Sequence, residues 1–361
     1  MSTRLLPGAR SALSRSQLLS FAFVGLNIVI MSSFVASSSR GQSILNRIIG
    51  SERGSGIFRY IFSSSSAKRL GSSSGAGAPS AEGSGSLHFS PMGTPRPSVV
   101  HKTLTRSSLK DRVVIVGDVH GCLDELKLLL EKTSYDARDT TLIFVGDLVN
   151  KGPFSLETLR LVRQLSAHCV RGNHDDACLS QLLRYRADGQ GHSLPPHYSY
   201  VKELSDADLQ WLADLPYTLT LPSLSSIVVH AGVNPALPLE AQLPADMYSI
   251  RNVVSPGEDS ESALPPRGSA GDKEGVAWAT YLDSLHRGGV AASGSHHVYF
   301  GHDAKRGLQL NEWSTGLDTG CCYGKLLTAA VITREPSGGV RKEIVSVNAL
   351  RQYEEPKARG D

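Results

Sequence analysis

The stretch TLIFVGDLVNKGP, Thr141 to Pro153, decides the fold because it combines a buried strand with a polar turn. Thr141 and four apolar residues precede Gly146, which is typical of a strand covered on both faces. Asp147 follows at the end of this strand, and Asn150 and Lys151 come soon after. A single Asp in such a place is usually a turn or capping residue. The meaning of Asp147 therefore depends on what the other strands carry.

The surrounding sequence alternates short β-branched runs with helical patterns from about residue 111 onward. The predicted strands are residues 112–117, 141–146, 226–230, 297–301, 326–333 and 343–347. The predicted helices, in which apolar residues recur at steps of three and four, are residues 123–132, 155–165, 176–185 and 206–215. This alternation predicts an α/β domain built in layers.

Composition divides the 361-residue chain into five parts. Residues 1–110 carry 13 Lys and Arg against only two acids, whereas residues 111–361 carry 24 against 32. The basic balance therefore belongs to the leader and predicts nothing about the ligands of the domain. We expect the following parts: a basic flank (1–17), a membrane or signal-anchor helix (18–36), a disordered Ser/Gly-rich linker (37–110), the folded domain (111–350, with a loose insert at 255–275) and a polar tail (351–361).

The membrane helix is predicted from an uncharged, mostly apolar run of 19 residues, close to the roughly 20 that cross a bilayer. Arg4, Arg10 and Arg15 precede this run and favour a cytosolic N-terminus. A cleaved secretory signal, a mitochondrial presequence and a buried core helix are the alternatives. The five cysteines form no zinc-finger spacing, and the Cys321-Cys322 pair is interpreted as two small buried residues.

Five strand ends share one kind of chemistry. The segments GDVHG, GDLVNKGP, GNHD, HAGV and GHD each combine glycine with Asp, His or Asn. These segments supply Asp118, His120, Asp147, Asn173, His174, Asp175, His230 and His302. Carboxylate, imidazole and amide donors without a thiolate suit Mn²⁺, Zn²⁺, Fe or Co²⁺. Two such ions roughly 3.5–4 Å apart would suit phosphoryl transfer, with Asp147 as the shared ligand.

The ordered set of motifs resembles the calcineurin-type metallophosphatases, and in particular their ApaH-like branch. The resemblance extends to LDTGCCYGKLLTA (317–329) and covers about residues 112–333. It implies a four-layer αββα sandwich with the metals at the carboxyl ends of the central strands. It further implies two divalent ions per chain, one held by Asp118, His120 and Asp147. The second would be held by Asp147, Asn173, His230 and His302.

The resemblance also implies roles in catalysis. The nucleophile would be a hydroxide bridging the two metals, and His174 would be the general acid. Arg171 matches an arginine that grips phosphate, a task for which its planar fork is suited. Lys151 stands where protein phosphatases carry a second arginine, and Asn173 would also lie against the substrate phosphate.

Asn150 departs from the pattern GDxVDRG of the Ser/Thr protein phosphatases, in which an Asp orients the catalytic histidine. We expect Asn150 to accept a hydrogen bond from His174 without stabilising its charged form; a plain turn residue is the alternative. The sequence Asn-Lys-Gly-Pro at residues 150–153 is typical of the ApaH-like branch and favours phosphoanhydride substrates. The leaving group of a phosphoanhydride needs less help from a general acid. The same sequence argues against a protein phosphatase.

The predicted substrate is inorganic polyphosphate, because a membrane leader with a long tether resembles the arrangement of vacuolar endopolyphosphatases. Symmetrical cleavage of dinucleoside tetraphosphates is the first alternative, followed by a protein phosphatase and a non-catalytic phosphate-binding scaffold. Either main substrate is a polyanion, and no DNA partner is expected. Eight basic residues near the motifs could contact it: Lys151, Arg171, Arg184, Arg186, Arg251, Lys305, Arg306 and Lys325. The expected location is a vacuolar or other secretory membrane with a lumenal domain, or alternatively the mitochondrion.

Overall fold

The computed structural model describes residues 89–188, 193–255, 265–290 and 296–356 of the chain. The predicted membrane helix (18–36) and residues 37–88 of the predicted linker lie outside these residues. Among the helices that the structure does describe, none combines the length and the apolar character needed to cross a membrane.

One central sheet has five strands in the order β14-β13-β2-β3-β4. β2, β3 and β4 run parallel, while β13 lies antiparallel to both β2 and β14. The bounds are β2 Arg112–Val116, β3 Thr140–Phe144, β4 His168–Cys169, β13 Leu326–Arg334 and β14 Val340–Asn348. All five residues of β3 are buried, as the apolar run predicted.

A second sheet has six strands in the order β1-β5-β6-β10-β12-β11. β6 and β10 run parallel, so their carboxyl ends lie at the same edge. The bounds are β1 His101–Thr103, β5 Thr218–Leu221, β6 Ser226–Val229, β10 His297–Phe300, β11 Gln309–Leu310 and β12 Ser314–Gly316. Apolar side chains from both sheets, including Ile115, Ile143, Val228 and Tyr299, form one buried cluster between them.

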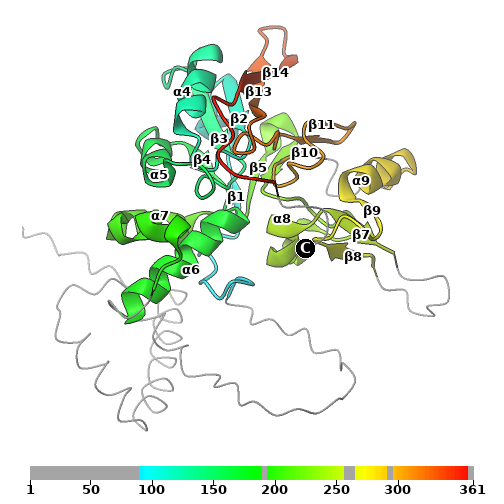
Figure 1. The fold of residues 1–361 in the computed structure, drawn as a ribbon. Coiled ribbons are helices and arrows are strands. Elements are labelled where there is room, and N and C mark those ends of the chain that lie inside the picture. Colours follow the sequence, from blue (N-terminus) through cyan, green and yellow to red (C-terminus); the bar gives the residue numbers. More distant parts are fainter. Residues whose placement is uncertain (1–88, 189–192, 256–264, 291–295, 357–361) are drawn as a thin grey trace, which may run out of the picture. The chain divides into compact units, whose positions relative to one another are not determined.

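Helices cover the outer faces of the two sheets (Figure 1). α4 packs against β13 and β14, and α5 packs against α4. A second apolar cluster, which contains Met247 of α8 and Trp278 of α9, lies on the far side of β6 and β10. The α-helices are α4 Leu123–Lys132, α5 Ser155–Gln164, α6 Asn173–Asp188, α7 Asp206–Asp214, α8 Pro244–Ser249 and α9 Trp278–Arg287. Short 3₁₀ helices are η1 Arg106–Ser108, η3 Pro196–Glu203, η4 Pro222–Leu224 and η5 Leu239–Ala241. The layers therefore follow the order helices, sheet, sheet, helices, as in the predicted sandwich.

The predicted loose insert contains ordered structure at its C-terminal end. β7 (Asn252–Val254), β8 (Arg267–Ser269) and β9 (Val276–Ala277) form a small antiparallel sheet in the order β8-β7-β9. The prediction of a loose segment is therefore wrong for residues 265–275, where β8 supplies backbone pairing that a Ser-, Gly- and Pro-rich composition did not indicate.

The folded unit also extends beyond both predicted domain boundaries. Leu104 and Leu109 are 2% and 4% exposed and belong to the core between the sheets, and β1 pairs with β5. The prediction of a disordered linker is therefore wrong for residues 89–110, because this segment contributes strand pairing and apolar burial. At the other end, Tyr353 of the predicted polar tail donates its hydroxyl to Glu125 at 2.8 Å.

Candidate metal centre

Five strand ends bring the predicted ligands to one edge of the two sheets. Asp118 follows β2, Asp147 follows β3, and Asn173 begins α6 after β4. His230 directly follows β6, and His302 comes two residues after β10. Because these strands run parallel within each sheet, their carboxyl ends present the six ligands to a shared space.

The turns that carry these residues are conformationally strained. Among the described residues, eight non-glycine residues have a positive φ, and five belong to the predicted site: His120, Asp147, Asn150, Lys151 and His302. Left-handed backbone at a non-glycine residue is unfavourable and persists only where the surrounding structure enforces it. The fold therefore supplies free energy to hold these side chains in place.

Two glycines let the carboxylates approach the neighbouring backbone. A Cβ on Gly172 would lie 2.2 Å from Asp147 Oδ1, and a Cβ on Gly301 would lie 1.9 Å from Asp118 Oδ1. No side chain fits at such distances, so glycine is required at both positions. The glycines of GNHD and GHD thus serve the site by leaving room for its acids.

Asn173 lies between two imidazoles. Its Oδ1 is 3.0 Å from His230 Nε2 and 3.1 Å from His302 Nδ1. His230 donates from Nδ1 to the Val145 carbonyl at 2.9 Å, so a neutral ring carries a lone pair on Nε2. That lone pair faces the amide oxygen, an arrangement that a cation between them would stabilise.

His120 is oriented in the same manner. Its Nδ1 lies 3.1 Å from the Val149 carbonyl, which leaves the lone pair on Nε2. That nitrogen lies 3.5 Å from Asp147 Oδ2 and 4.0 Å from Asp118 Oδ2. Asp147 also places its other oxygen 3.5 Å from His230 Nε2. Asp147 therefore lies between the two histidines, as a shared ligand must.

Burial raises the pKa values of the carboxyl ligands and lowers those of the histidine ligands, so it favours the neutral form of both. It raises the pKa of Asp118 well above its usual range, and the carboxylates of Asp318 and Asp147 raise it further. It also raises the pKa of Asp147 to about 7 and lowers that of His230 to about 4. Neutral imidazoles and crowded carboxylates are the donors that a divalent cation binds and neutralises. The donor set fits divalent metal ions.

Two further acids support the centre, and neither was assigned a role from the sequence. Asp175 accepts hydrogen bonds from the backbone N–H groups of Asp147, Leu148 and Gly172 at 2.8–3.0 Å, which fixes the turn after β3. Asp318 is 5% exposed and follows β12, a strand that reads only Ser-Thr-Gly. The Gly-Leu-Asp sequence at that strand end was the available signal for it.

Asn150 contacts His174 as a hydrogen-bond donor, whereas we predicted from the sequence that it would be the acceptor. Its Nδ2 donates to the His174 carbonyl at 3.2 Å and lies 3.3 Å from His174 Nδ1, while its Oδ1 accepts from the Tyr200 hydroxyl at 2.7 Å. Because a carbonyl can only accept, the amide NH₂ must face His174. The expected acceptor role is wrong, since Tyr200 already occupies the amide oxygen.

This contact fixes one tautomer of the neutral His174 ring. A ring that accepts from Asn150 at Nδ1 carries its proton on Nε2. The His174 backbone N–H donates to Asp147 Oδ1 at 2.8 Å, which ties the residue to the central acid. His174 is thus held beside the ligands with a proton on the nitrogen that does not face Asn150.

Lys151 lies within the ligand cluster. Its Nζ is 2.8 Å from His120 Nε2 and 5.3 Å from the centre of the Tyr323 ring. Burial alone would lower the pKa of Lys151, but the carboxylate of Asp147 and other nearby groups raise it overall. The ammonium is therefore charged and places a positive charge among the predicted metal ligands.

Arg171 does not occupy the place expected of a phosphate-binding residue. It is 1% exposed, its Nη1 pairs with Asp176 at 3.2 Å and its Nη2 donates to the Ala213 carbonyl at 2.6 Å. The guanidinium thus stabilises the core around α6 and α7, and its burial means that it is not presented to a ligand in this structure.

Arg251 is better placed among the eight basic candidates. Its Nη2 lies 3.4 Å from the His302 carbonyl, and its Nε is 3.7 Å from Asp303. Its charge also acts on the pKa values of Asp147 and His302. Arg251 therefore lies beside the ligand cluster, whereas Arg186 and Lys305 form ion pairs with Asp206 and Asp272.

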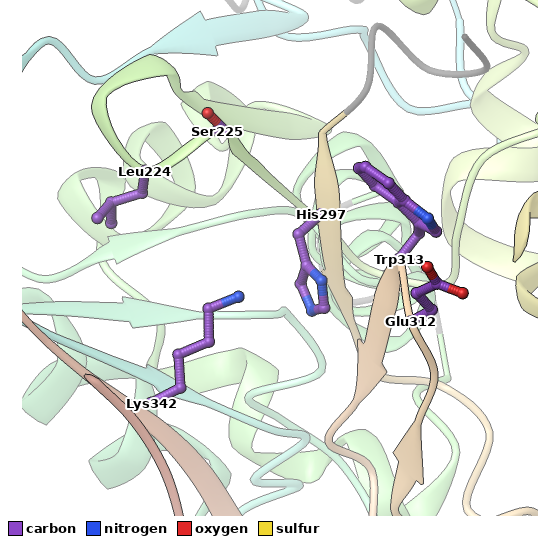
Figure 2. A pocket seen from close by; sticks show the side chains of 6 residues that line it. All are labelled: Leu224, Ser225, His297, Glu312, Trp313 and Lys342. Atoms are coloured by element: carbon purple, nitrogen blue, oxygen red, sulfur yellow. The ribbon is translucent and has the colours of Figure 1, made fainter. Parts of the chain in front are cut away.

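A separate cavity of about 260 Å³ lies at the other end of the same strands. Figure 2 shows its lining residues, with the ammonium of Lys342 extended toward His297. His297 is the first residue of β10 and Ser225 precedes β6, whereas His302 and His230 follow those strands. The cavity is therefore distinct from the metal centre.

Comparison with known proteins gives a consistent result. Residues 111–258 match the family described as "Calcineurin-like phosphoesterase". Symmetrical bis(5'-nucleosyl)-tetraphosphatase from Vibrio parahaemolyticus is 32% identical over 262 residues, which cover 59% of this chain and 92% of that enzyme. The enzyme of the same name from Psychromonas ingrahamii is 37% identical over 148 residues, which cover 40% of this chain and 52% of that enzyme.

A solved structure shares the fold at the same level of sequence identity. It was described as that of a candidate diadenosine tetraphosphatase, and it aligns with a TM-score of 0.55 at 31% identity. The alignment covers 70% of this chain and 99% of that one.

Proposed function

Because the chain belongs to the calcineurin-like phosphoesterase family, we propose that it is a symmetrical dinucleoside tetraphosphatase. It is a metal-dependent phosphohydrolase, as the family match and the tetraphosphatase relatives indicate. The substrate assignment rests on one observation above all: the relative from Vibrio parahaemolyticus aligns over 92% of its length and is a symmetrical tetraphosphatase by name.

This proposal replaces polyphosphate as the leading substrate. The preference for polyphosphate depended on a membrane leader and tether, and residues 1–88 lie outside the described structure. The relatives instead favour the alternative that the NKGP version of the motif already allowed. Both substrates contain phosphoanhydride bonds, so the reaction class is unchanged.

The residues that would hold the metal ions are Asp118, His120, Asp147, Asn173, His230 and His302. When bound, divalent ions would polarise the phosphoryl oxygens of the substrate and neutralise charge that develops on them. The approach of two imidazole nitrogens to Asn173 Oδ1 and the crowding of Asp118, Asp147 and Asp318 support this assignment.

In the proposed reaction, a water molecule adds across the central anhydride of the tetraphosphate. Its oxygen forms a bond to one of the two inner phosphorus atoms, and the bond from that atom to the bridging oxygen breaks. The bridging oxygen leaves on the other nucleoside diphosphate as an anionic phosphate oxygen and accepts a hydrogen bond from His174 Nε2. The attacking water loses a proton to solvent, and diadenosine tetraphosphate yields two molecules of ADP.

Two cations beside the ligands would position the polyphosphate. The Lys151 ammonium is held in the cluster by its contact with His120, and Arg251 lies next to His302. A guanidinium can donate two parallel hydrogen bonds to a phosphate, whereas an ammonium acts as a point charge. Together they would fix which anhydride lies over the metal centre.

The test is a substrate panel with the full chain and Mn²⁺ or Co²⁺. We expect diadenosine tetraphosphate to give ADP as its only nucleotide product, and the Asp147→Asn variant to be inactive. AMP and ATP in equal amounts would contradict symmetrical cleavage. Faster shortening of long-chain polyphosphate, or dephosphorylation of a phosphopeptide without any ADP release, would overturn the substrate assignment while leaving the hydrolase assignment intact.

A further inference from the structure

A second group of potential metal ligands lies outside the centre described above. Cys122, Glu125 and Cys321 each offer one ligand atom, and these atoms lie within 4.8 Å of one another. Cys122 immediately precedes α4, Glu125 lies in the first turn of that helix, and Cys321 comes from the segment after β12. The three residues are 0%, 0% and 2% exposed.

Glu125 has an unfulfilled hydrogen-bonding capacity inside this group. Its Oε1 accepts from the Leu350 backbone N–H at 2.9 Å and from the Tyr353 hydroxyl at 2.8 Å. Its Oε2 is buried and has no hydrogen-bond partner among the described residues. A buried carboxylate oxygen without a partner is costly, so this atom requires a positive charge or a donor.

The protein side chains nearby do not supply that charge. The Lys151 ammonium, which acts on Cys122 electrostatically, makes its close contact with His120 and not with Glu125. A hydrogen bond between the thiols of Cys122 and Cys321 would account for their proximity. It would leave Glu125 Oε2 unpaired.

We propose that Cys122, Glu125 and Cys321 bind a zinc ion that stabilises the folded domain. Two thiolates and one carboxylate are established zinc donors, and a cation at this point would pair with the free oxygen of Glu125. The metal centre at the strand ends contains no thiolate, so the two sites differ in the metals they prefer. Cys322 is also buried, and Cys122 lies close enough to raise its pKa electrostatically, which makes Cys322 a candidate for a fourth ligand.

The C-terminal segment encloses this zinc site. The backbone N–H groups of Tyr353 and Glu354 donate to the Cys322 carbonyl at 2.9 and 3.0 Å, and Tyr353 reaches Glu125 from the same segment. An enclosed site surrounded by ordered backbone is characteristic of structural zinc rather than of an ion that exchanges with substrate.

Such an ion would connect two loops of the metal centre. Cys122 comes two residues after His120, and Cys321 comes three residues after Asp318. A bond from each cysteine to the same zinc would fix the turn that carries Asp118 and His120 against the segment that carries Asp318.

Cobalt substitution can separate this site from the metal centre, because thiolate-to-cobalt charge transfer gives a distinct near-ultraviolet absorption. The full-length Asp147→Asn/His230→Asn double variant, reduced and loaded with Co²⁺, should retain one cobalt ion per chain with this absorption. Adding Cys321→Ser should reduce the absorption by about half, because one of the two thiolate ligands is removed. Adding Cys169→Ala, which removes another buried thiol, should leave it unchanged.

A folded double variant that retains no cobalt, or retains it without thiolate absorption, would overturn the proposal. So would an undiminished band after Cys321→Ser. If the cysteine variant fails to fold by circular dichroism, Glu125→Gln offers a milder test in which cobalt affinity should fall at least tenfold. Equal affinity in that variant would contradict the proposed role of the carboxylate.

Discussion

His174 takes its orientation from Asn150, and this single contact separates the site from one built around an aspartate. The amide donates toward Nδ1, so the neutral ring holds its proton on Nε2 without needing a neighbouring negative charge. An amide cannot stabilise a charged imidazolium in the way a carboxylate would. The arrangement therefore suits a substrate whose leaving group is a phosphate anion rather than an alkoxide.

Replacing His174 by Asn should reduce kcat by about 10²–10⁴-fold, the usual contribution of a general acid. Metal content should remain unchanged, because the six predicted ligands are intact. Steady-state kinetics with diadenosine tetraphosphate and metal analysis of the same preparation measure both quantities. His286→Asn, which changes a histidine stacked on Trp313, is the matched control and should keep full activity. Loss of metal from the His174 variant would show that this residue acts as a ligand instead.

His297 is the first residue of β10 and lines the cavity there, and it should make the free energy of unfolding depend on pH. Burial, followed by the charge of Lys342, lowers its pKa from 6.5 to about 4. Below pH 6.5 the unfolded chain therefore takes up a proton that the folded chain does not, and folding stability falls as the pH decreases toward 4. From about pH 7.5 to about pH 5 the expected loss is about 2 kcal/mol.

His297→Gln should remove this part of the pH dependence. Urea unfolding in the presence of a chelator, at both pH values, compares the variant with the wild type without interference from metal release. His197→Gln changes an exposed histidine and should leave the difference as it is. An equal loss of stability in the wild type and the His297 variant would contradict the assignment.

At the scale of elements, the loop after β10 shows why a glycine is needed. Gly301→Ala would place a methyl group 1.9 Å from Asp118 Oδ1 and 2.7 Å from Val145 Cγ2. Asp118 must then move, and displacements of this size can cost about 100-fold in rate. We expect lower metal occupancy and a loss of activity of that order, measured by metal analysis and initial rates.

Gly271→Ala provides the control for this substitution. Its Cβ would come no closer than 3.5 Å to the nearest other side chain, Ser269, so activity should be unchanged. Normal metal content in the Gly301 variant would mean that the loop can relax without moving Asp118.

The elements that carry the centre were those most accessible to prediction from sequence. Strong apolar periodicity identified α4 with its observed bounds, and β3 and β6 within two residues. The ends of β2, β3, β4, β6 and β10 then gave the six candidate ligands, because Asp, His and Asn next to glycine form an unusual pattern there. The local sequence contained most of the required information in these cases.

The remaining features depend on contacts between distant parts of the chain. β12 is three polar or small residues, so neither it nor the acid after it could be identified by pattern. The burial of Arg171 requires Asp176 and the α7 carbonyl of Ala213, and the orientation of Asn150 requires Tyr200. Sequence spacing alone cannot show which distant residue will form a hydrogen bond or an ion pair with a given polar side chain.

At the scale of the whole molecule, metal binding should contribute directly to stability. A ligand that binds only the folded chain adds about 2.7 kcal/mol at 100 times its Kd. Mn²⁺ binds thiolates weakly, so it reports on the carboxylate and imidazole centre. We expect Mn²⁺ to raise the unfolding temperature of the wild type and to have little effect on the Asp147→Asn/His230→Asn variant. An equal rise in both proteins would place the manganese elsewhere.

Asp118 accepts hydrogen bonds from the backbone N–H of His302, although the two residues are 184 positions apart. Glu125 contacts Tyr353 over a separation of 228 residues. Contacts of such range slow folding, because a long loop must close before they form. During synthesis, the N-terminal ligands must therefore wait for nearly the whole domain to leave the ribosome. A nascent chain that stops before His302 should carry most of the core and yet be unable to assemble the catalytic centre.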